Sequence, residues 1–202
     1  MRSDDPNLPH PLVIADALGE LCEQVVFLGG AVVGLLVSDP LADSVRATYD
    51  VDAVVDLEWS RFRGIEQRVE AQSFTREMHS GVLCRWVHGA SGVIFDLMPA
   101  DVGVLGFSNR WYTHAVETAQ AVALSDLLSI RWVTATTFVA TKLEAFTTRE
   151  GEATFFPVTT WRTYSTLLTA GLNWWKSSLQ SMQIFAVGSP MCSQRCWTTR
   201  LL

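Results

Sequence analysis

The stretch "RATYDVDAVVD", Arg46–Asp56, combines a strand pattern with an unusual pair of acids. Asp50 and Asp52 alternate with apolar residues, so an extended strand would point both carboxylates to one face. Ionised carboxylates at this spacing repel each other, and partial burial adds a desolvation cost. A bound divalent cation such as Mg²⁺ reverses the sign of that interaction. The alternative is a solvent-exposed acidic strand face, because D-x-D is a short and common pattern.

A glycine pair lies upstream of this stretch. The β-branched run "VVFLGG", residues 25–30, predicts a short strand that ends at Gly29-Gly30, and residues 31–39 predict a helix after it. Glycines at such a junction let backbone N–H groups approach a phosphate closely. An ordinary tight turn is the alternative interpretation of the pair.

A third carboxylate, Asp96, lies within the apolar run "GVIFDLMPA", residues 92–100. This run predicts another strand, and an acid between Phe95 and Leu97 needs a partner or a cation if its face is covered. An exposed strand position is the alternative. Together the three acids are candidate metal ligands.

The remaining periodicity predicts one mixed α/β or α+β core domain, residues 1–152, in which helices pack on a sheet. Thr134 is a candidate N-cap for the last helix. The expected helices cover residues 12–23, 31–39, 59–72 and 135–149, and the expected strands cover residues 25–30, 49–57, 74–78, 82–89, 92–100 and 128–133.

Composition excludes several classes of protein. A net charge of −6 does not favour a large nucleic-acid-binding surface. The four cysteines lack paired metal-ligand spacing, so we expect reduced thiols. The apolar runs are too short to span a bilayer and the polar start is unlike a signal peptide, so we expect a cytoplasmic protein with no membrane association.

Taken together, "FLGGAVVGLL", "RATYDVDAVVD" and "VIFDLMP" resemble the nucleotidyltransferase superfamily with the DNA polymerase β-like core. The pattern Arg46-x-Thr48-x-Asp50-Val-Asp52, with "TKLEAF" around Lys142, is similar to the abortive-infection toxin-like (AbiEii-type) branch. The resemblance covers about residues 20–150. The gap between Gly30 and Asp50 is longer than in the superfamily's minimal pattern.

The resemblance implies a Mg²⁺-dependent transfer of a nucleoside monophosphate from an NTP to a hydroxyl acceptor. Asp50, Asp52 and Asp96 would be catalytic and would bind two Mg²⁺ ions. Gly29, Gly30, Arg46, Thr48 and Lys142 would bind the nucleotide. The acceptor would be a small molecule, a protein or a tRNA, and the branch suggests a cognate partner protein. The alternative is a non-catalytic nucleotide- or partner-binding module, or the inactive product of a decayed gene.

Residues 153–202 differ from the core, because they contain four basic residues and no Asp or Glu, and they lack sustained periodicity. A small aromatic-rich subdomain or a membrane-surface segment is one interpretation of this irregular tail. The other is a frameshift: with permitted codons, Thr154–Ser178 can be reread one base earlier as an acidic peptide with helical spacing of Leu, Ile and Val.

We predict that the tail is frameshifted and poorly packed. Sequencing of the coding DNA tests this directly, because its −1 frame across residues 154–178 should encode the acidic amphipathic peptide. A −1 frame without that peptide contradicts the prediction.

Overall fold

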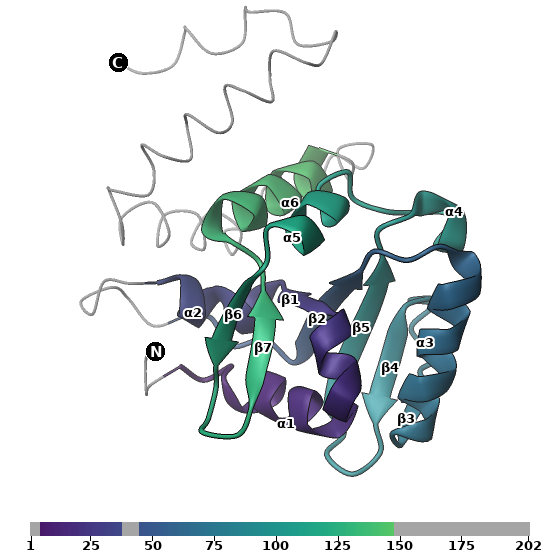
Figure 1. Cartoon of the computed structure of the whole chain (residues 1–202), viewed down its shortest axis with the longest axis horizontal. Helices are drawn as coiled ribbons and strands as arrows, with labels where there is room; N and C mark the ends of the chain where they lie inside the picture. The colour runs from purple at the N-terminus through teal and green to yellow at the C-terminus, as the bar shows by residue number, and fades with distance from the viewer. Residues whose placement is uncertain (1–4, 38–44, 148–202) are drawn as a thin grey trace, which may run out of the picture.

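The computed structural model describes residues 5–37 and 45–147, which form a mixed sheet with helices packed on it (Figure 1). The strands are β1 (Val26–Leu28), β2 (Asp50–Val55), β3 (Phe74–Arg76), β4 (Arg85–His88), β5 (Ile94–Pro99), β6 (Gln120–Ala123) and β7 (Ser129–Trp132). The α-helices are α1 (Pro9–Leu18), α2 (Val33–Leu36), α3 (Trp59–Ala71), α4 (Val102–Leu105), α5 (Tyr112–Glu117) and α6 (Ala135–Thr147). Short 3-10 helices are η1 (Gly19–Gln24) and η2 (Gly30–Val32).

The sheet has seven strands in the order β3-β4-β5-β2-β1-β7-β6. The pairs β2–β5 and β1–β7 are parallel, and the other neighbouring pairs are antiparallel. The expectation of a mixed sheet flanked by helices in an α+β domain is therefore confirmed.

Alternation along β2 separates the core from the functional face. Val51, Ala53 and Val55 are buried, whereas Asp50 and Asp52 between them are partly exposed. Because successive strand residues point to opposite faces, one side of β2 is committed to the apolar core. Helix α1 contacts β2, and α3 contacts β3 and η1, while α5 and α6 lie side by side near the other end of the sheet (Figure 1).

Two local differences from the sequence-based expectation have physical causes. In the described part of the helix expected over residues 31–39, the structure has η2 and the short α2 instead. The sequence could not predict this break, because an almost wholly apolar run has no helical periodicity. The edge strand β6 is mostly exposed and so lacks the apolar alternation of a half-buried strand. By contrast, Thr134 accepts a hydrogen bond from the Thr137 N–H (3.4 Å), as expected of the N-cap of α6.

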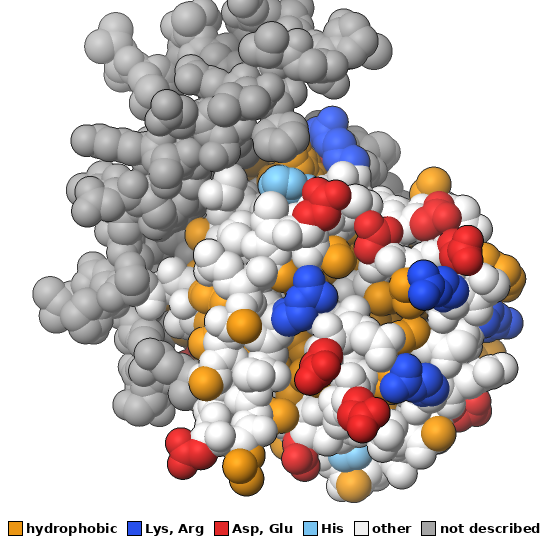
Figure 2. Space-filling model, in the orientation of Figure 1, with side chains coloured by type: hydrophobic (Ala, Val, Ile, Leu, Met, Phe, Trp, Pro, Cys, Tyr) orange, Lys and Arg blue, Asp and Glu red, His pale blue; other side chains and the backbone are white. Residues whose placement is uncertain are grey.

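On the face shown in Figure 2, acidic and basic side chains are interspersed and neither sign gathers into a large patch. Within residues 5–37 and 45–147, every helix is too short or too polar to cross a bilayer. The predicted frameshifted tail, residues 153–202, lies outside the described residues.

Candidate active site

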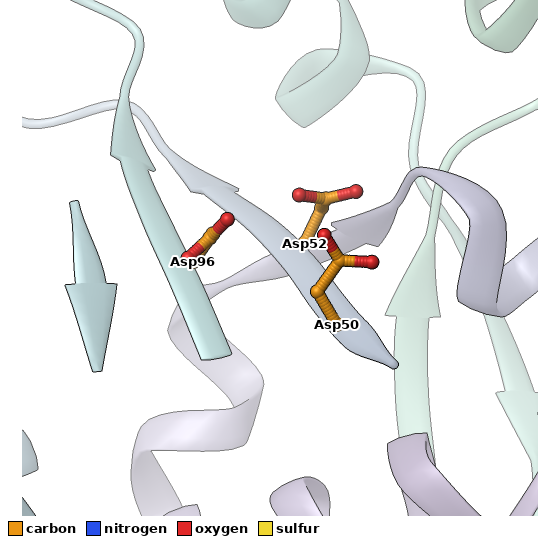
Figure 3. A group of neighbouring side chains, drawn as sticks. All are labelled: Asp50, Asp52 and Asp96. Carbon is orange, nitrogen blue, oxygen red and sulfur yellow. The ribbon is translucent and has the colours of Figure 1, made fainter. Parts of the chain in front are cut away.

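One row of residues across four strands brings the acidic side chains together. The β1–β2 register places Leu28 beside Asp52, and the β2–β5 register places Asp52 beside Asp96. The β4–β5 register then places Arg85 beside Asp96. Neighbours in such a row point to the same face of a sheet. In Figure 3, the side chains of Asp50 and Asp52 on β2 and of Asp96 on the adjacent β5 extend to the same side of the sheet.

These three aspartates, here called the acidic cluster, have the donor set of a divalent cation site. Their carboxylates each offer an oxygen, and these oxygens all lie within 4.8 Å of one another. Asp96 is buried, at 6% exposure, and the other two are partly exposed. Three anionic oxygens at this spacing fit a hard cation such as Mg²⁺. The structure therefore places all three predicted metal ligands in one group.

The glycine pair is sterically tied to the acidic cluster. Gly29 has a φ of 75°, in the left-handed region, and a Cβ there would collide with the carboxylate of Asp52. A Cβ on Gly30 would lie 3.2 Å from the Cβ of Thr48, closer than side chains normally pack. The two predicted phosphate-binding glycines thus lie directly against Asp52 and Thr48, which belong to β2 and the segment before it.

A buried asparagine that the sequence analysis did not single out holds the segment before β2. Asn7 is fully buried; its Nδ2 donates to the carbonyl of Arg46 (2.8 Å), and its Oδ1 accepts from the Thr48 N–H (2.8 Å). The Thr48 hydroxyl in turn donates to Asp50 Oδ1. Asp5 Oδ1 accepts from the Asn7 N–H (2.9 Å). A chain of hydrogen bonds therefore runs from the N-terminal segment to a candidate metal ligand.

Helix α6 brings a cation close to the acidic cluster. Lys142 is partly buried, with Nζ 5.6 Å from the ring centroid of Phe138. The buried Asn109 fixes this helix by donating from Nδ2 to the carbonyl of Thr141 (2.9 Å). Lys142 is close enough to Asp52 to oppose the rise of its pKa.

All the predicted site residues line one cleft of about 790 Å³, although Arg46 is exposed at its mouth. The predicted residues in its lining are Gly29, Gly30, Arg46, Thr48, Asp50, Asp52, Asp96 and Lys142. Apolar and aromatic side chains complete the walls, among them Leu28, Val33, Tyr49, Ile94, Met98, Tyr112 and Phe138. A cleft of this size and mixed chemistry suits a small-molecule ligand with an anionic group.

Burial and crowding perturb the titration of the cleft. Desolvation, with repulsion from Asp50 and Asp96, raises the pKa of Asp52 to about 7. Burial raises the pKa of the Cys84 thiol to about 11, so this cysteine is a neutral thiol near neutral pH. Burial also raises the pKa of Tyr112, whose hydroxyl donates to Met98 Sδ (3.0 Å). The unusual carboxyl is therefore Asp52, at the centre of the acidic cluster.

The sequence analysis also missed Arg85. Its Nε and one terminal nitrogen donate to the two oxygens of Asp96 (2.8 and 2.7 Å), and that terminal nitrogen lies 3.7 Å from Asp50 Oδ2. An arginine inside the apolar run over residues 82–89 was the available signal. Its partner follows only from the register of β4 on β5. Asn7 had no signal, because a polar N-terminal segment does not reveal burial.

Comparison with known proteins identifies the fold. No protein-family model matches the chain, and no curated protein matches its sequence. The structure is similar to the crystal structure of an antigenic nucleotidyltransferase-like protein from Paracoccidioides brasiliensis. The TM-score is 0.55 at 14% sequence identity, and the match covers 94% of this chain and 91% of that one. The protein therefore has a fold consistent with that of a nucleotidyltransferase-like protein.

We predict that Gly29→Ala destabilises the protein by about 1–3 kcal/mol and weakens divalent-cation binding, because the backbone is left-handed and the new Cβ displaces Asp52. Urea unfolding and cation titration measure the two effects. Gly64→Ala in α3 is the matched control, since its Cβ would meet no atom within 4 Å. It should be neutral or stabilise by about 0.5–1 kcal/mol. Equal unfolding free energies for both variants would contradict the prediction.

The raised pKa of Asp52 predicts a pH dependence of stability. Between about pH 4, where an unfolded Asp titrates, and about pH 7, the folded state binds the extra proton. Without divalent ions, the free energy of unfolding should therefore fall as pH rises through this window. Asp52→Asn removes the titrating group and should flatten this component, as urea unfolding at about pH 5 and about pH 8 would show. The same slope in both proteins would refute the assignment.

Proposed function

We propose that this protein is a Mg²⁺-dependent nucleotidyltransferase that moves a nucleoside monophosphate from an NTP to a hydroxyl acceptor. The observation that carries the proposal is the convergence of the acidic cluster, the Gly29 turn and Lys142 on one cleft. The nucleotidyltransferase-like neighbour supports it at the level of the fold. Three carboxylates beside a lysine suit a substrate that arrives as a metal–triphosphate complex.

In the proposed mechanism the aspartates bind the metal ions, and the glycine pair binds the triphosphate. Asp50 and Asp52 would hold two Mg²⁺ ions, and Asp96 would share in ligating the catalytic one. When bound, the ions supply neutralisation of the charge on the reacting phosphate and on the leaving oxygen. Gly29-Gly30 lets the triphosphate approach the backbone, since neither residue has a side chain to exclude it.

Lys142 supplies a point charge from the α6 side of the cleft. Arg46 and Thr48 lie on the segment that leads into β2 and line the cleft, where they contact the bound nucleotide. The Thr48 hydroxyl also orients the proposed metal ligand Asp50. In this arrangement one positive group approaches the phosphates from α6 and the other from the segment that leads into β2.

The reaction is an in-line displacement at the α-phosphorus. The acceptor oxygen forms a bond to that phosphorus while the bond to the bridging oxygen of pyrophosphate breaks. Pyrophosphate leaves with the bonding electrons, and Asp96 assists removal of the hydroxyl proton.

We further propose that the chain belongs to the abortive-infection toxin-like branch. The support is the run Arg46-x-Thr48-x-Asp50-Val-Asp52 together with Lys142 on α6. The acceptor is then a small-molecule hydroxyl, a protein side chain or a tRNA end, and the net charge of −6 makes tRNA the least favoured of the three.

A non-catalytic nucleotide-binding module is the second candidate. The ion pair with Arg85 favours it, because that arginine engages both oxygens of Asp96. A protein in which this pair persists would bind the metal–nucleotide complex without assisting proton removal. NTP- and Mg²⁺-dependent stabilisation without any transfer would identify this case.

We predict that replacing Asp50 and Asp52 together by asparagine lowers transfer from α-labelled NTPs by roughly a thousandfold or more, because charge neutralisation at the phosphates is lost. The assay offers small-molecule, protein and tRNA acceptors in parallel. Mg²⁺-dependent NTP binding, followed by thermal shift, should disappear in the same variant.

Asp56→Asn is the matched control. Asp56 follows β2 directly and is exposed, and it is not among the residues that line the cleft. This control should transfer label at the wild-type rate. Transfer by the double variant at the rate of the Asp56 control would refute the proposed mechanism.

A further inference from the structure

Arg85 lies across the acidic cluster. Its side chain, 21% exposed, pairs with Asp96 through Nε and a terminal nitrogen and reaches to within 3.7 Å of Asp50 Oδ2. The parallel hydrogen bonds to Asp96 have the fork geometry of the strongest arginine–carboxylate pairs. One cation of the protein itself therefore already lies between two of the three carboxylates.

This placement sets up competition with a divalent ion. A guanidinium within hydrogen-bond distance of Asp96 repels any cation that approaches the same oxygens. Both oxygens of Asp96 already accept a hydrogen bond, so a metal ion must share or displace this partner. Asp96 is 6% exposed, which makes an unpaired carboxylate there costly. The acidic cluster thus needs Arg85 when metal-free and is hindered by it when metal binds.

We propose that Arg85 is a nucleotide-binding residue that exchanges partners: it neutralises Asp96 in the metal-free protein, and on metal binding it transfers its guanidinium to a phosphate of the incoming nucleotide. This inference rests on the function proposed above. It adds a nucleotide-binding residue that the motif pattern does not contain. It also gives an order of events, in which Asp96 is neutralised first by Arg85 and then by the metal ion.

The geometry permits this exchange. The register of β4 on β5 fixes the backbone of Arg85 directly beside Asp96, so the guanidinium can move without any strand shifting. The side chain lines the same cleft as Gly29-Gly30 and Lys142. A guanidinium fits a phosphate as it fits a carboxylate, through two parallel hydrogen bonds. Rotation about the side-chain bonds is therefore sufficient to change partners.

A static ion pair is the competing account, and it makes a different prediction. A permanently paired Arg85 contributes only a constant positive charge near the cluster. Removing it would then ease cation binding without weakening nucleotide binding. The exchange predicts opposite signs for the two affinities in one variant.

The test is calorimetric titration of Arg85→Met with Mn²⁺ alone, and then with α,β-methylene analogues of ATP, GTP, CTP and UTP at saturating Mg²⁺. The methylene bridge prevents transfer, so only binding is measured. We expect Mn²⁺ to bind about tenfold more tightly and the preferred analogue about tenfold more weakly than in the wild type. Arg85→Lys keeps the charge but loses the fork, so it should show smaller changes of the same signs.

Arg63→Met is the control, because Arg63 pairs with Glu66 on α3 and does not line the cleft. It should leave both affinities unchanged. Tighter Mn²⁺ binding with analogue affinity unchanged or increased would establish the static pair and overturn the exchange. Unchanged Mn²⁺ affinity would also overturn the exchange, because Arg85 would then not oppose the cation. If Arg85→Met does not fold, Arg85→Lys decides by the same criteria. A wild-type protein that binds neither Mn²⁺ nor any analogue would instead refute the proposed function, and this inference with it.

Discussion

The parallel register of β2 on β5 is the constraint on which the candidate site depends. It sets Asp52 directly beside Asp96, residues that are far apart along the chain. The antiparallel strands on either side extend this row to Leu28, just before the glycine turn, and to Arg85. A shift of one residue would turn either carboxylate toward the apolar core, where Val51 and Phe95 are fully buried. The core that makes the fold stable therefore also fixes the register of the site.

Concentrating three carboxylates on a half-buried sheet face opposes stability. The raised pKa of Asp52 expresses that opposition, since burial and its two acidic neighbours all disfavour ionisation there. The positive charges of Arg85 and Lys142 offset this repulsion only in part. Because repulsion among the carboxylates is not fully offset in the protein alone, a bound cation would remove that repulsion and so bind more favourably. This property distinguishes the cluster from an ordinary acidic surface.

Much of this arrangement could be predicted from the sequence, for identifiable reasons. The alternation around Asp50 and Asp52 and the apolar run around Asp96 are local patterns, and the glycine pair marks its own turn. The partners of these residues are not local. Arg85 meets Asp96 only through strand pairing, and Asn7 reaches Thr48 only after the N-terminal segment folds against the start of β2. Edge strand β6 escaped prediction because its exposed residues carry no apolar period.

Asn7 holds the start of β2 in place, where repulsion between the Asp50 and Asp52 carboxylates would otherwise disorder the strand. A cation hydrogen-bonded to Asp50 would compete with an incoming metal ion, as Arg85 does at Asp96; the Arg85 terminal nitrogen lies 3.7 Å from Asp50 Oδ2, beyond hydrogen-bond distance. Neutral hydrogen bonds avoid that conflict: the Asn7 amide holds the backbone on both sides of Ala47, and the Thr48 hydroxyl orients the carboxylate. Because Asn7 is buried, water does not compete for these bonds. Asp50 is thus oriented by an uncharged hydroxyl and the buried Asp96 by the Arg85 guanidinium, so a cation can approach Asp50 without first displacing a hydrogen-bonded positive partner.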